Sequence, residues 1–320
     1  MRVAIIGAGM SGLSCADGLT KAGHDITLFD KGRGPGGRMS TRRMETPLGQ
    51  VSFDHGAQYF TARDPAFLKQ VKAWESMGVA TAWSMPAPDA WVGAPGMNAI
   101  IKAMAEQHDV RWGNQVERLE NCAGTWSLKT RDQSFPDFDS VVLAIPAEQA
   151  LPFLSLHDFT MAREAMLARS QPCWTAMFTF AAPLPGVPEI VRDHGNIGWA
   201  ARNNAKPQRS GPEGWVVQAR PEWSRAHVED CADQVIPVLL QELAEALGAD
   251  IPSPIASAAH RWRYAMSGGL RHGAMWNADI GLGLCADWLL GPRVECAWLS
   301  GQALAGKILG TVTATQNVAA

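Results

Sequence analysis

The sequence predicts an α/β protein of two domains. One is a nucleotide-binding domain on a Rossmann-type parallel sheet, and the other is an α+β domain on a mixed or antiparallel sheet. Three observations lead to this fold class. The chain opens with a strand, a glycine-rich turn, a helix and a second strand. Apolar strand-like runs return at residues 140–146 and 280–288. Between residues 150 and 273, short strand-like runs alternate with turns rich in proline and glycine.

The first thirty residues have the pattern of a dinucleotide-binding βαβ unit. A strand is expected over residues 2–6, a helix over 13–21 and a second strand over 25–30. Gly7 permits a tight turn, Gly9 lets a pyrophosphate approach the backbone, and Gly12 lets the helix pack on the sheet. The helix N-terminus attracts phosphate, and Asp30 can accept hydrogen bonds from a ribose. The unit predicts a bound dinucleotide without saying which one.

Composition narrows the classes of function. The chain is 47% hydrophobic and 18% charged, as in ordinary globular proteins, and its net charge of −3 gives no reason to expect nucleic acid or a membrane as partner. The six cysteines contain no C-x-x-C pair, and no His, Cys or carboxylate cluster has metal spacing. We therefore predict no metal site and a reducing, cytoplasmic location. No apolar run approaches the ~18 residues of a membrane span.

The segment after Asp30 is rich in glycine and arginine. Residues 31–43 are expected to form a flexible loop. In it, Gly36 and Gly37 offer backbone N–H groups and Arg38 offers a guanidinium, a combination that suits phosphate.

The rest of the chain leaves the nucleotide-binding domain and returns to it twice. Helices are expected over residues 64–74, 99–107, 229–247 and 295–309, and strands over 110–112, 114–119, 125–130, 140–146, 173–180, 197–201, 215–219 and 280–288. We assign residues 1–60, 105–149 and 274–320 to the nucleotide-binding domain, and residues 61–104 and 150–273 to a substrate domain.

Together, Gly7-x-Gly9-x-x-Gly12, Asp30 and Gly36-Gly37-Arg38-x-x-Thr41 resemble the opening of the flavin amine oxidase-type superfamily. The resemblance implies FAD as the cofactor and an FAD-binding domain like that of p-hydroxybenzoate hydroxylase. It also implies that residues 53–60 pass along the flavin ring, and that Asp287 and the helix after it serve the ribityl chain and the pyrimidine ring. The expected FAD-binding residues are Gly7, Gly9, Met10, Ser11, Gly12, Asp30, Lys31, Gly37, Arg38, Met39, His55, Gly56, Ala57, Val116, Asp287 and Val294.

Within that superfamily, the sequence is most similar to the bacterial renalases, through residues 54–60, 95–97, 260–264 and 287–295. This resemblance implies oxidation of reduced nicotinamide dinucleotides that carry the hydride at the 2- or 6-position. Hydride passes to flavin N5, NAD(P)⁺ leaves, and O₂ takes the electrons and gives H₂O₂. No catalytic side chain is required, because formation of the aromatic ring drives the transfer. The expected substrate-binding residues are Gln58, Tyr59, Phe60, Gly96, Trp199, His260, Arg263 and Trp288.

Several alternatives stay open at this point. Arg202, Lys206, Arg261 or Arg263 could supply the cation that a phosphate-bearing substrate needs. A structural role is favoured for His55, whereas His260 could equally act on substrate. The preference between NAD and NADP forms, the 2- or 6-position, the pocket residues within 150–255 and the oligomeric state are not determined.

The second candidate function is a flavin amine oxidase acting on a small amine. Such a site is usually lined by a pair of aromatic side chains. A pair of tyrosines would have to be Tyr59 and Tyr264, the only tyrosines in the sequence. A cage of tryptophans would also serve. A flavin-binding sensor or carrier is the least favoured function, because the substrate region is well over a hundred residues long.

Overall fold

The computed structural model describes the backbone of residues 1–318 and the side chains of residues 1–312. It divides into two compact units. Unit 1 contains Met1–Gly37, Ile101–Ser170 and Met266–Ala320, and unit 2 contains Arg38–Ile100 and Gln171–Ala265. The chain therefore crosses between the units four times. Residues 38–60 belong to unit 2, and residues 101–104, 150–170 and 266–273 belong to unit 1, whereas the sequence analysis assigned each of these ranges to the other domain. The two longest of these ranges are explained below.

Unit 1 is built on a six-stranded sheet in the order β18-β19-β12-β1-β2-β8. Its strands are β1 (Arg2–Ile6), β2 (Asp25–Asp30), β8 (Asp109–Trp112), β12 (Ser140–Leu143), β18 (Met275–Asn277) and β19 (Leu282–Leu284). All neighbours pair in parallel except β18, which is antiparallel to β19. β1 lies between β12 and β2, so the glycine turn after it leaves the middle of the sheet. This is the parallel, Rossmann-type sheet expected from the sequence.

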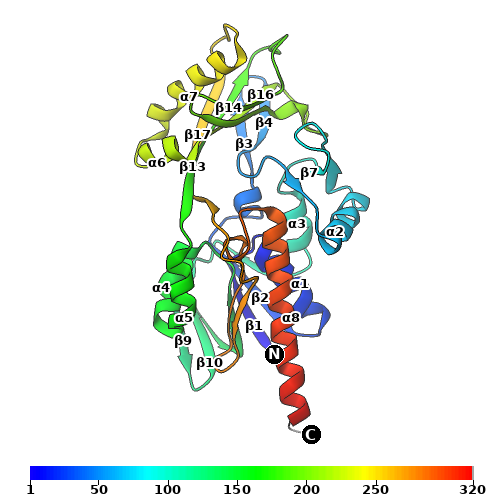
Figure 1. Cartoon of the computed structure of the whole chain (residues 1–320), viewed down its shortest axis with the longest axis vertical. Coiled ribbons are helices and arrows are strands. Elements are labelled where there is room, and N and C mark those ends of the chain that lie inside the picture. Colours follow the sequence, from blue (N-terminus) through cyan, green and yellow to red (C-terminus); the bar gives the residue numbers. More distant parts are fainter. Residues whose placement is uncertain (319–320) are drawn as a thin grey trace. The chain divides into compact units, whose positions relative to one another are not determined.

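Helices cover this sheet. α1 (Met10–Lys21) lies beside α8 (Val294–Val318), as Figure 1 shows in dark blue and red. The two helices approach closely at Gly301, where an added Cβ would lie 2.3 Å from the Ser11 carbonyl oxygen. Two further helices, α4 (Ala147–His157) and α5 (Phe159–Leu167), share a hydrophobic core with the six-stranded sheet. A three-stranded antiparallel meander contributes to the same core and consists of β9 (Arg118–Cys122), β10 (Thr125–Lys129) and β11 (Ser134–Phe138).

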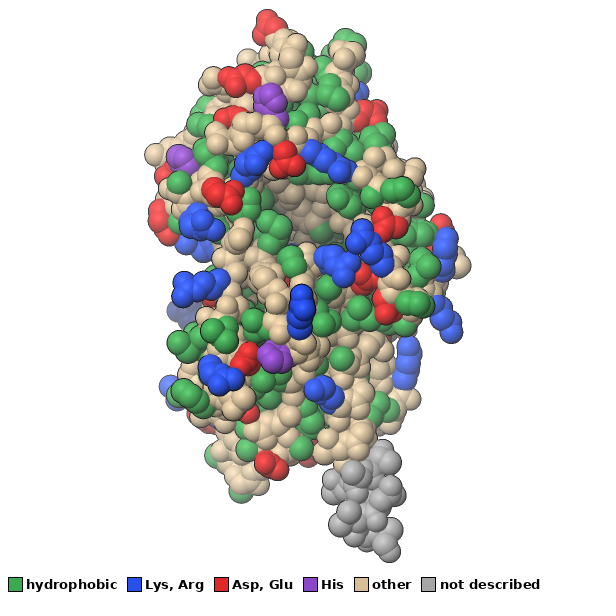
Figure 2. All heavy atoms as spheres, viewed as in Figure 1, with side chains coloured by type: hydrophobic (Ala, Val, Ile, Leu, Met, Phe, Trp, Pro, Cys, Tyr) green, Lys and Arg blue, Asp and Glu red, His purple; other side chains and the backbone are tan. Residues whose placement is uncertain are grey.

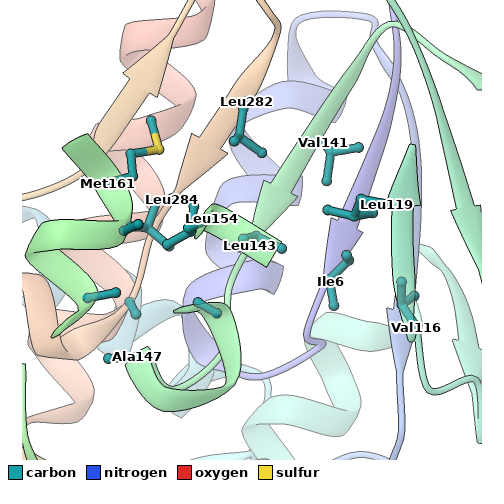
Figure 3. Packing of buried hydrophobic residues seen from close by; sticks show 14 of the residues in the cluster. Ile6, Val116, Leu119, Val141, Leu143, Ala147, Leu154, Met161, Leu282 and Leu284 are labelled. Atoms are coloured by element: carbon teal, nitrogen blue, oxygen red, sulfur yellow. The ribbon is translucent and has the colours of Figure 1, made fainter. Parts of the chain in front are cut away.

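The core of unit 1 explains why residues 150–170 belong to it. Leu154 of α4 and Met161 of α5 are buried in one hydrophobic cluster with Leu143 and Leu284 of the sheet (Figure 3). The sequence analysis placed this stretch in the substrate domain, because it identified neither helix. The helical periodicity of apolar residues is weak in this stretch, and Pro152, which lies inside α4, is a residue that normally argues against a helix.

Unit 2 is built on a five-stranded sheet in the order β14-β15-β16-β13-β17. Its strands are β13 (Ser170–Phe180), β14 (Ile190–His194), β15 (Ile197–Arg202), β16 (Glu213–Ala219) and β17 (Ala256–Ser267). α7 (Ala232–Leu247) presents Val235, Leu239, Leu243 and Leu247 to the sheet at helical spacing. α7 begins after Cys231, so the helix expected from residue 229 is shorter, and α6 (Pro221–Ala226) precedes it.

A hairpin explains why residues 38–60 belong to unit 2. β3 (Thr41–Thr46) pairs with β4 (Gly49–Asp54), and Val51 and Phe53 of β4 are buried against Met177 and Val216 of the large sheet. The expectation of a flexible loop through residue 43 is therefore wrong. Residues 37–39 form a 3₁₀ turn, and β3 begins at residue 41, since its partner strand supplies the hydrogen bonds that the sequence pattern did not reveal.

The remaining elements of unit 2 lie around a small antiparallel sheet in the order β5-β7-β6. They are β5 (Phe60–Thr61), β6 (Ala80–Ala82), β7 (Ala90–Gly93), α2 (Pro65–Ser76) and α3 (Ala99–Ala105), the last of which crosses the unit boundary. Asp64 caps α2 by accepting hydrogen bonds from the N–H groups of Ala66 and Phe67, as expected of a helix at this position.

On the face drawn in Figure 2, acidic and basic side chains are interspersed, and neither sign dominates. No helix in the described part of the chain is both long enough and apolar enough to cross a membrane.

Candidate functional site

The glycine turn of unit 1 has the geometry that a pyrophosphate needs. Gly7 has φ of +106°, and a Cβ on Gly12 would lie 2.0 Å from the Gly7 carbonyl oxygen, so neither position accepts a side chain. Gly9 differs, because a Cβ there would meet nothing within 4 Å. Gly9 also caps α1 without a side-chain hydrogen bond, which leaves the N–H groups of the first turn available.

Two further features of unit 1 fit a bound dinucleotide. The hydroxyl of Ser11, in the first turn of α1, is buried and has no hydrogen-bond partner among the described residues. Gly37 lies next to the first motif, since a Cβ added to it would be 3.9 Å from the Gly9 Cα. The two glycine motifs thus meet at the N-terminus of α1.

The carboxylate of Asp30 is fixed at the end of β2. Its Oδ2 accepts from the N–H of Ala8 at 2.8 Å, and its Oδ1 accepts from the N–H of Gly32 at 2.7 Å. Each carboxylate oxygen can accept a second hydrogen bond. The geometry therefore leaves acceptor capacity for ribose hydroxyls beside the glycine turn.

The other nucleotide residues expected in unit 1 lie in two places. Asp287 is in a 3₁₀ turn (Asp287–Leu289) just before α8 begins at Val294, and its side chain is buried. Val116 is buried in the core cluster with Ile6. Trp288, which the sequence analysis expected to contact the substrate, is fully buried in the same core cluster. Its indole N–H donates to the Ile145 carbonyl at 3.1 Å.

In unit 2, the turn at residues 54–58 is held by hydrogen bonds to successive carbonyls. The Asp54 carbonyl accepts from the Gln58 amide at 2.5 Å, and the His55 carbonyl accepts from the Trp262 indole at 2.8 Å. The Gly56 carbonyl accepts from Gln218 at 2.7 Å and from Gln58 at 3.1 Å. Gln58 thus holds the turn from within, and the distant side chains of Gln218 and Trp262 hold it from strands of the large sheet.

Gly56 allows no substitution at the centre of that turn. A Cβ there would lie 2.0 Å from the Arg38 carbonyl oxygen, and the next residue, Ala57, donates its N–H to that same oxygen at 2.9 Å. The sequence analysis expected a flavin ring to approach the backbone closely here; within the protein, the close backbone neighbour of Gly56 is Arg38.

A buried charge cluster lies beside the turn. Asp54 is 1% exposed, and its Oδ2 accepts from Arg209 Nη2 at 2.6 Å and from Lys206 Nζ at 3.4 Å. Its Oδ1 accepts from the Thr41 hydroxyl and the Met97 N–H, both at 2.8 Å. One carboxylate therefore faces two cations, and the cluster has an excess of positive charge.

Burial and the neighbouring charges shift the pKa values of Asp54 and Lys206. Burial alone would raise the pKa of the Asp54 carboxyl, but the charges of Lys206 and Arg209 outweigh it and lower the pKa to about 2. Burial lowers the pKa of the Lys206 ammonium to about 8, against the attraction of Asp54. Lys206 also donates to the Gln58 side-chain oxygen at 3.0 Å. Gln58 is thereby used internally, whereas the sequence analysis expected it to face a substrate.

An aromatic group surrounds Tyr59. Its ring centre lies 5.3 Å from that of Trp199 and 6.4 Å from that of Trp83. Two cations lie over the indoles: Arg192 Cζ is 4.9 Å from the Trp199 ring centre, and Lys206 Nζ is 5.8 Å from the Trp83 ring centre. Sequence reasoning missed Trp83 and Arg192, which occur in no motif.

Arg192 also borders open space. A hollow of about 700 Å³ in unit 2 is lined by Met85, Pro86, Glu189, Ile190 and Arg192. Arg192 donates to the Pro86 carbonyl at 2.6 Å, which fixes the guanidinium between this hollow and the Trp199 ring.

A second aromatic group joins the two histidines singled out in the sequence. The His55 ring centre lies 5.0 Å from both the His260 and Trp262 ring centres. Burial, and then the nearby charges of His260 and Arg42, lower the pKa of His55 to about 4, so it is neutral at pH 7. Burial also lowers the pKa of His260. Both shifts are downward from the ordinary value of 6.5 and so favour the neutral form of each ring.

Other expected substrate residues have different partners. Phe60 is buried against Phe67, and a Cβ on buried Gly96 would lie 2.9 Å from the Thr41 hydroxyl. Arg263 is exposed and pairs with Glu229 at 2.7 Å. Of the cations considered for a phosphate, Lys206 is fully buried and Arg202 pairs with Glu213. Among the described residues, no group of three or more His, Cys, Asp or Glu side chains could hold a metal ion.

Two family models match most of the chain, whereas curated proteins match only a short part of it. Residues 5–73 match the family model of the NAD(P)-binding Rossmann-like domain, and residues 82–274, more than half of the chain, match that of flavin containing amine oxidoreductase. Among curated proteins, an L-amino acid oxidase of Bothrops pictus is 52% identical over 44 residues, which cover 14% of this chain and 9% of that protein. Such relatives are thus matched over less than a tenth of their own length.

Solved structures of similar fold cover nearly the whole chain. A protein of Exiguobacterium sp. 255-15, provisionally described as a protoporphyrinogen oxidase, has a TM-score of 0.76 at 13% identity, covering 96% of this chain and 98% of that one. Cyclohexylamine oxidase of Brevibacterium oxydans IH-35A has a TM-score of 0.70 at 14% identity, covering 98% and 99%. These likenesses show the fold. The family match shows that the chain belongs to the flavin containing amine oxidoreductases, for which FAD is the cofactor.

Proposed function

We propose that this protein is an FAD-dependent oxidase of isomeric dihydronicotinamide dinucleotides, those with the hydride at the 2- or 6-position. The products would be NAD(P)⁺ and, with O₂ and one proton, H₂O₂. The observation that carries the proposal is the aromatic group of Tyr59, Trp83 and Trp199 with cations over both indoles. Bound FAD supplies the two-electron acceptor, and the side chains of the protein orient the substrate.

A dinucleotide substrate is flat at one end and anionic in the middle. Indole and phenol rings stack on a dihydropyridine, and guanidinium groups bind phosphate through charge-assisted hydrogen bonds. Arg192 offers such a group at the edge of a hollow, next to Trp199. The excess positive charge of the Asp54 cluster, beside Tyr59 in sequence, adds a further attraction for anions.

The proposed reaction needs no general base. Loss of hydride makes the nicotinamide ring aromatic, and its nitrogen lone pair drives the step. The two histidines of unit 2 suit this, because burial keeps His55 neutral and lowers the pKa of His260. Their role would be to shape the site and exclude water.

A flavin amine oxidase remains the second candidate, and membership of the family favours it. The aromatic pair that such an enzyme uses would not be Tyr59 with Tyr264, since the ring neighbours of Tyr59 in the described part of the chain are Trp83 and Trp199. A cage made of these tryptophans is compatible with a small amine. Buried Lys206 and Arg209 disfavour a cationic ligand, so we rank this function second.

We propose the following residue roles, which the geometry supports. Tyr59, Trp199 and His260 remain the substrate-binding candidates with partly exposed rings, joined by Arg192. In unit 1, Gly9, Ser11 and Asp30 would hold the pyrophosphate and ribose, and Asp287 the ribityl chain. We expect Asp287→Asn to release FAD more readily than the parent protein, measured as flavin fluorescence in the filtrate after dilution.

Anaerobic mixing tests the function. The flavin-loaded protein is mixed with 2-dihydro-NAD, with 6-dihydro-NAD and with benzylamine, and the flavin absorbance is followed. We expect bleaching by a dihydro-NAD isomer and not by the amine. Ordinary 4-dihydro-NAD is the control that detects simple reduction by any dihydropyridine. Bleaching by benzylamine alone would make the amine oxidase the better assignment.

A further inference from the structure

Helices α4 and α5 of unit 1 expose an unusual set of side chains. Leu156, Phe159, Met166 and Leu167 are 74%, 81%, 62% and 61% exposed. Apolar side chains of this size gain from burial, so four of them in twelve residues indicate a surface that something covers. We call it the α4–α5 surface. It comprises the exposed residues Pro152, Ser155, Leu156, Phe159, Thr160, Arg163, Met166, Leu167 and Arg169.

The exposed residues of α5 lie on one face. Phe159, Arg163, Met166 and Leu167 are spaced i, i+4, i+7 and i+8, which places them along one stripe of a helix. The opposite face carries Met161, Ala162 and Ala165, which are buried in the core of unit 1. α5 therefore carries apolar side chains on its outer face as well as on its core face.

The charges on this surface have one sign. Its exposed charged residues, within the described chain, are Arg163 and Arg169. The acids of the same helices are less exposed, and each is already hydrogen-bonded: Glu148 and Asp158 are half-buried, and Glu148 accepts from Ser170. Asp158 caps α5 at the Met161 N–H, and Glu164, itself buried, pairs with Arg163 at 3.0 Å and with His272 at 2.9 Å.

We propose that the α4–α5 surface docks the protein onto an anionic phospholipid bilayer. A helix with apolar and arginine side chains on its outer face can lie in the headgroup region, with the apolar side chains in the acyl boundary. Arg169 would then contact lipid phosphates, and Arg163 would do so beside its ion pair with Glu164. This inference is independent of the reaction proposed above. The overall charge of −3 gave no hint of it, because the basic residues that matter are two in number and local.

A second copy of the chain fits this surface less well. Stable protein interfaces use about 20–30 residues on each side, whereas the α4–α5 surface has nine exposed residues. A twofold interface would also bring like-charged arginines together without an exposed acid on these helices to pair with them. A bilayer has neither requirement.

Vesicle flotation of the flavin-loaded protein tests the proposal. We expect it to float with vesicles of phosphatidylcholine mixed with phosphatidylglycerol, to remain unbound with phosphatidylcholine alone, and to be released as salt is raised. Phe159→Ser with Leu167→Ser should weaken binding at least about tenfold, since each buried apolar side chain contributes substantially. Arg163→Gln with Arg169→Gln should also weaken binding about tenfold.

Met77→Ser is the matched control, because Met77 is 60% exposed on unit 2 and should not affect flotation. Flavin absorbance and thermal melting confirm that each variant is folded. Failure to float with anionic vesicles would overturn the proposal. Equal flotation of the Phe159→Ser/Leu167→Ser protein would do so as well. A dimer on size exclusion that this variant abolishes, without vesicle binding, would assign the surface to a second copy.

Discussion

The Nζ of Lys206 lies 3.4 Å from Oδ2 of Asp54, and their side chains are 0% and 1% exposed. Arg209 shares the same oxygen at 2.6 Å. The single carboxylate therefore compensates part of the positive charge of two cations that would otherwise be buried alone, and it also accepts hydrogen bonds from Thr41 and Met97. We expect the stability of the turn at residues 54–58 to depend on this carboxylate more than on either cation.

We expect Asp54→Asn to destabilise the protein by about 3–5 kcal/mol, because it leaves two buried cations without a counter-charge. Lys206→Met should be milder, since the Asp54–Arg209 pair stays balanced. Urea unfolding measures both. The control is Asp89→Asn, which breaks the partly exposed Arg63–Asp89 pair and should change stability by about 1 kcal/mol or less. Equal losses for Asp54→Asn and Asp89→Asn would contradict the central role of Asp54.

The pKa of Lys206 predicts a pH dependence at alkaline pH. In the folded protein this pKa is lowered to about 8, from an ordinary value of 10.5. Between these values the unfolded chain binds more protons than the folded protein, so the Lys206 contribution makes stability rise with pH. We expect the difference in unfolding free energy, parent minus Lys206→Met, to increase from pH 8 to pH 10.5. A constant difference would mean that Lys206 titrates normally.

Gly9 allows flavin binding to be separated from folding. A Cβ at this position meets no protein atom within 4 Å, so Gly9→Ala should leave the stability of the flavin-free protein nearly unchanged. The same Cβ would occupy the space where a pyrophosphate approaches the backbone, and FAD content should fall at least about tenfold. Gly306→Ala, where a Cβ also meets nothing within 4 Å, is the control. Full FAD content in Gly9→Ala would place the pyrophosphate elsewhere.

Arg192 tests the anionic nature of the substrate. We expect Arg192→Gln to raise KM for the preferred dihydro-NAD isomer about fivefold with little change in kcat, as expected for loss of one exposed charge contact of about 1 kcal/mol. Arg111→Gln, on unit 1 and paired with Asp109, serves as the control. If KM is unchanged for the dinucleotide in steady-state assays, the substrate phosphates do not reach this guanidinium.

The sequence was most informative where structure is local. The strand, turn and helix of residues 1–30 are present as expected, because Gly7 needs its positive φ and Gly12 its close contact wherever this motif folds. The same holds for Asp30, which ends β2 beside the turn. The family resemblance and FAD followed once the second glycine motif, Gly36-Gly37-Arg38, was added, and both agree with the comparisons. The identity of the substrate could not be predicted in this way, because the residues that surround Tyr59 in the structure form no sequence motif.

Sequence alone thus determined the fold class, the dinucleotide-binding turn and FAD. Only the tertiary structure decided that Gln58 and Lys206 are internal, that Trp288 is a core residue, and that Trp83 and Arg192 join Tyr59 and Trp199. The reason is sequence separation. Asp54 and Lys206 are 152 residues apart, and the Trp262 indole that holds the His55 carbonyl is 207 residues away. Backbone sterics act between neighbours and leave a local pattern, whereas charge pairing and ring packing act between residues that only the folded chain brings together.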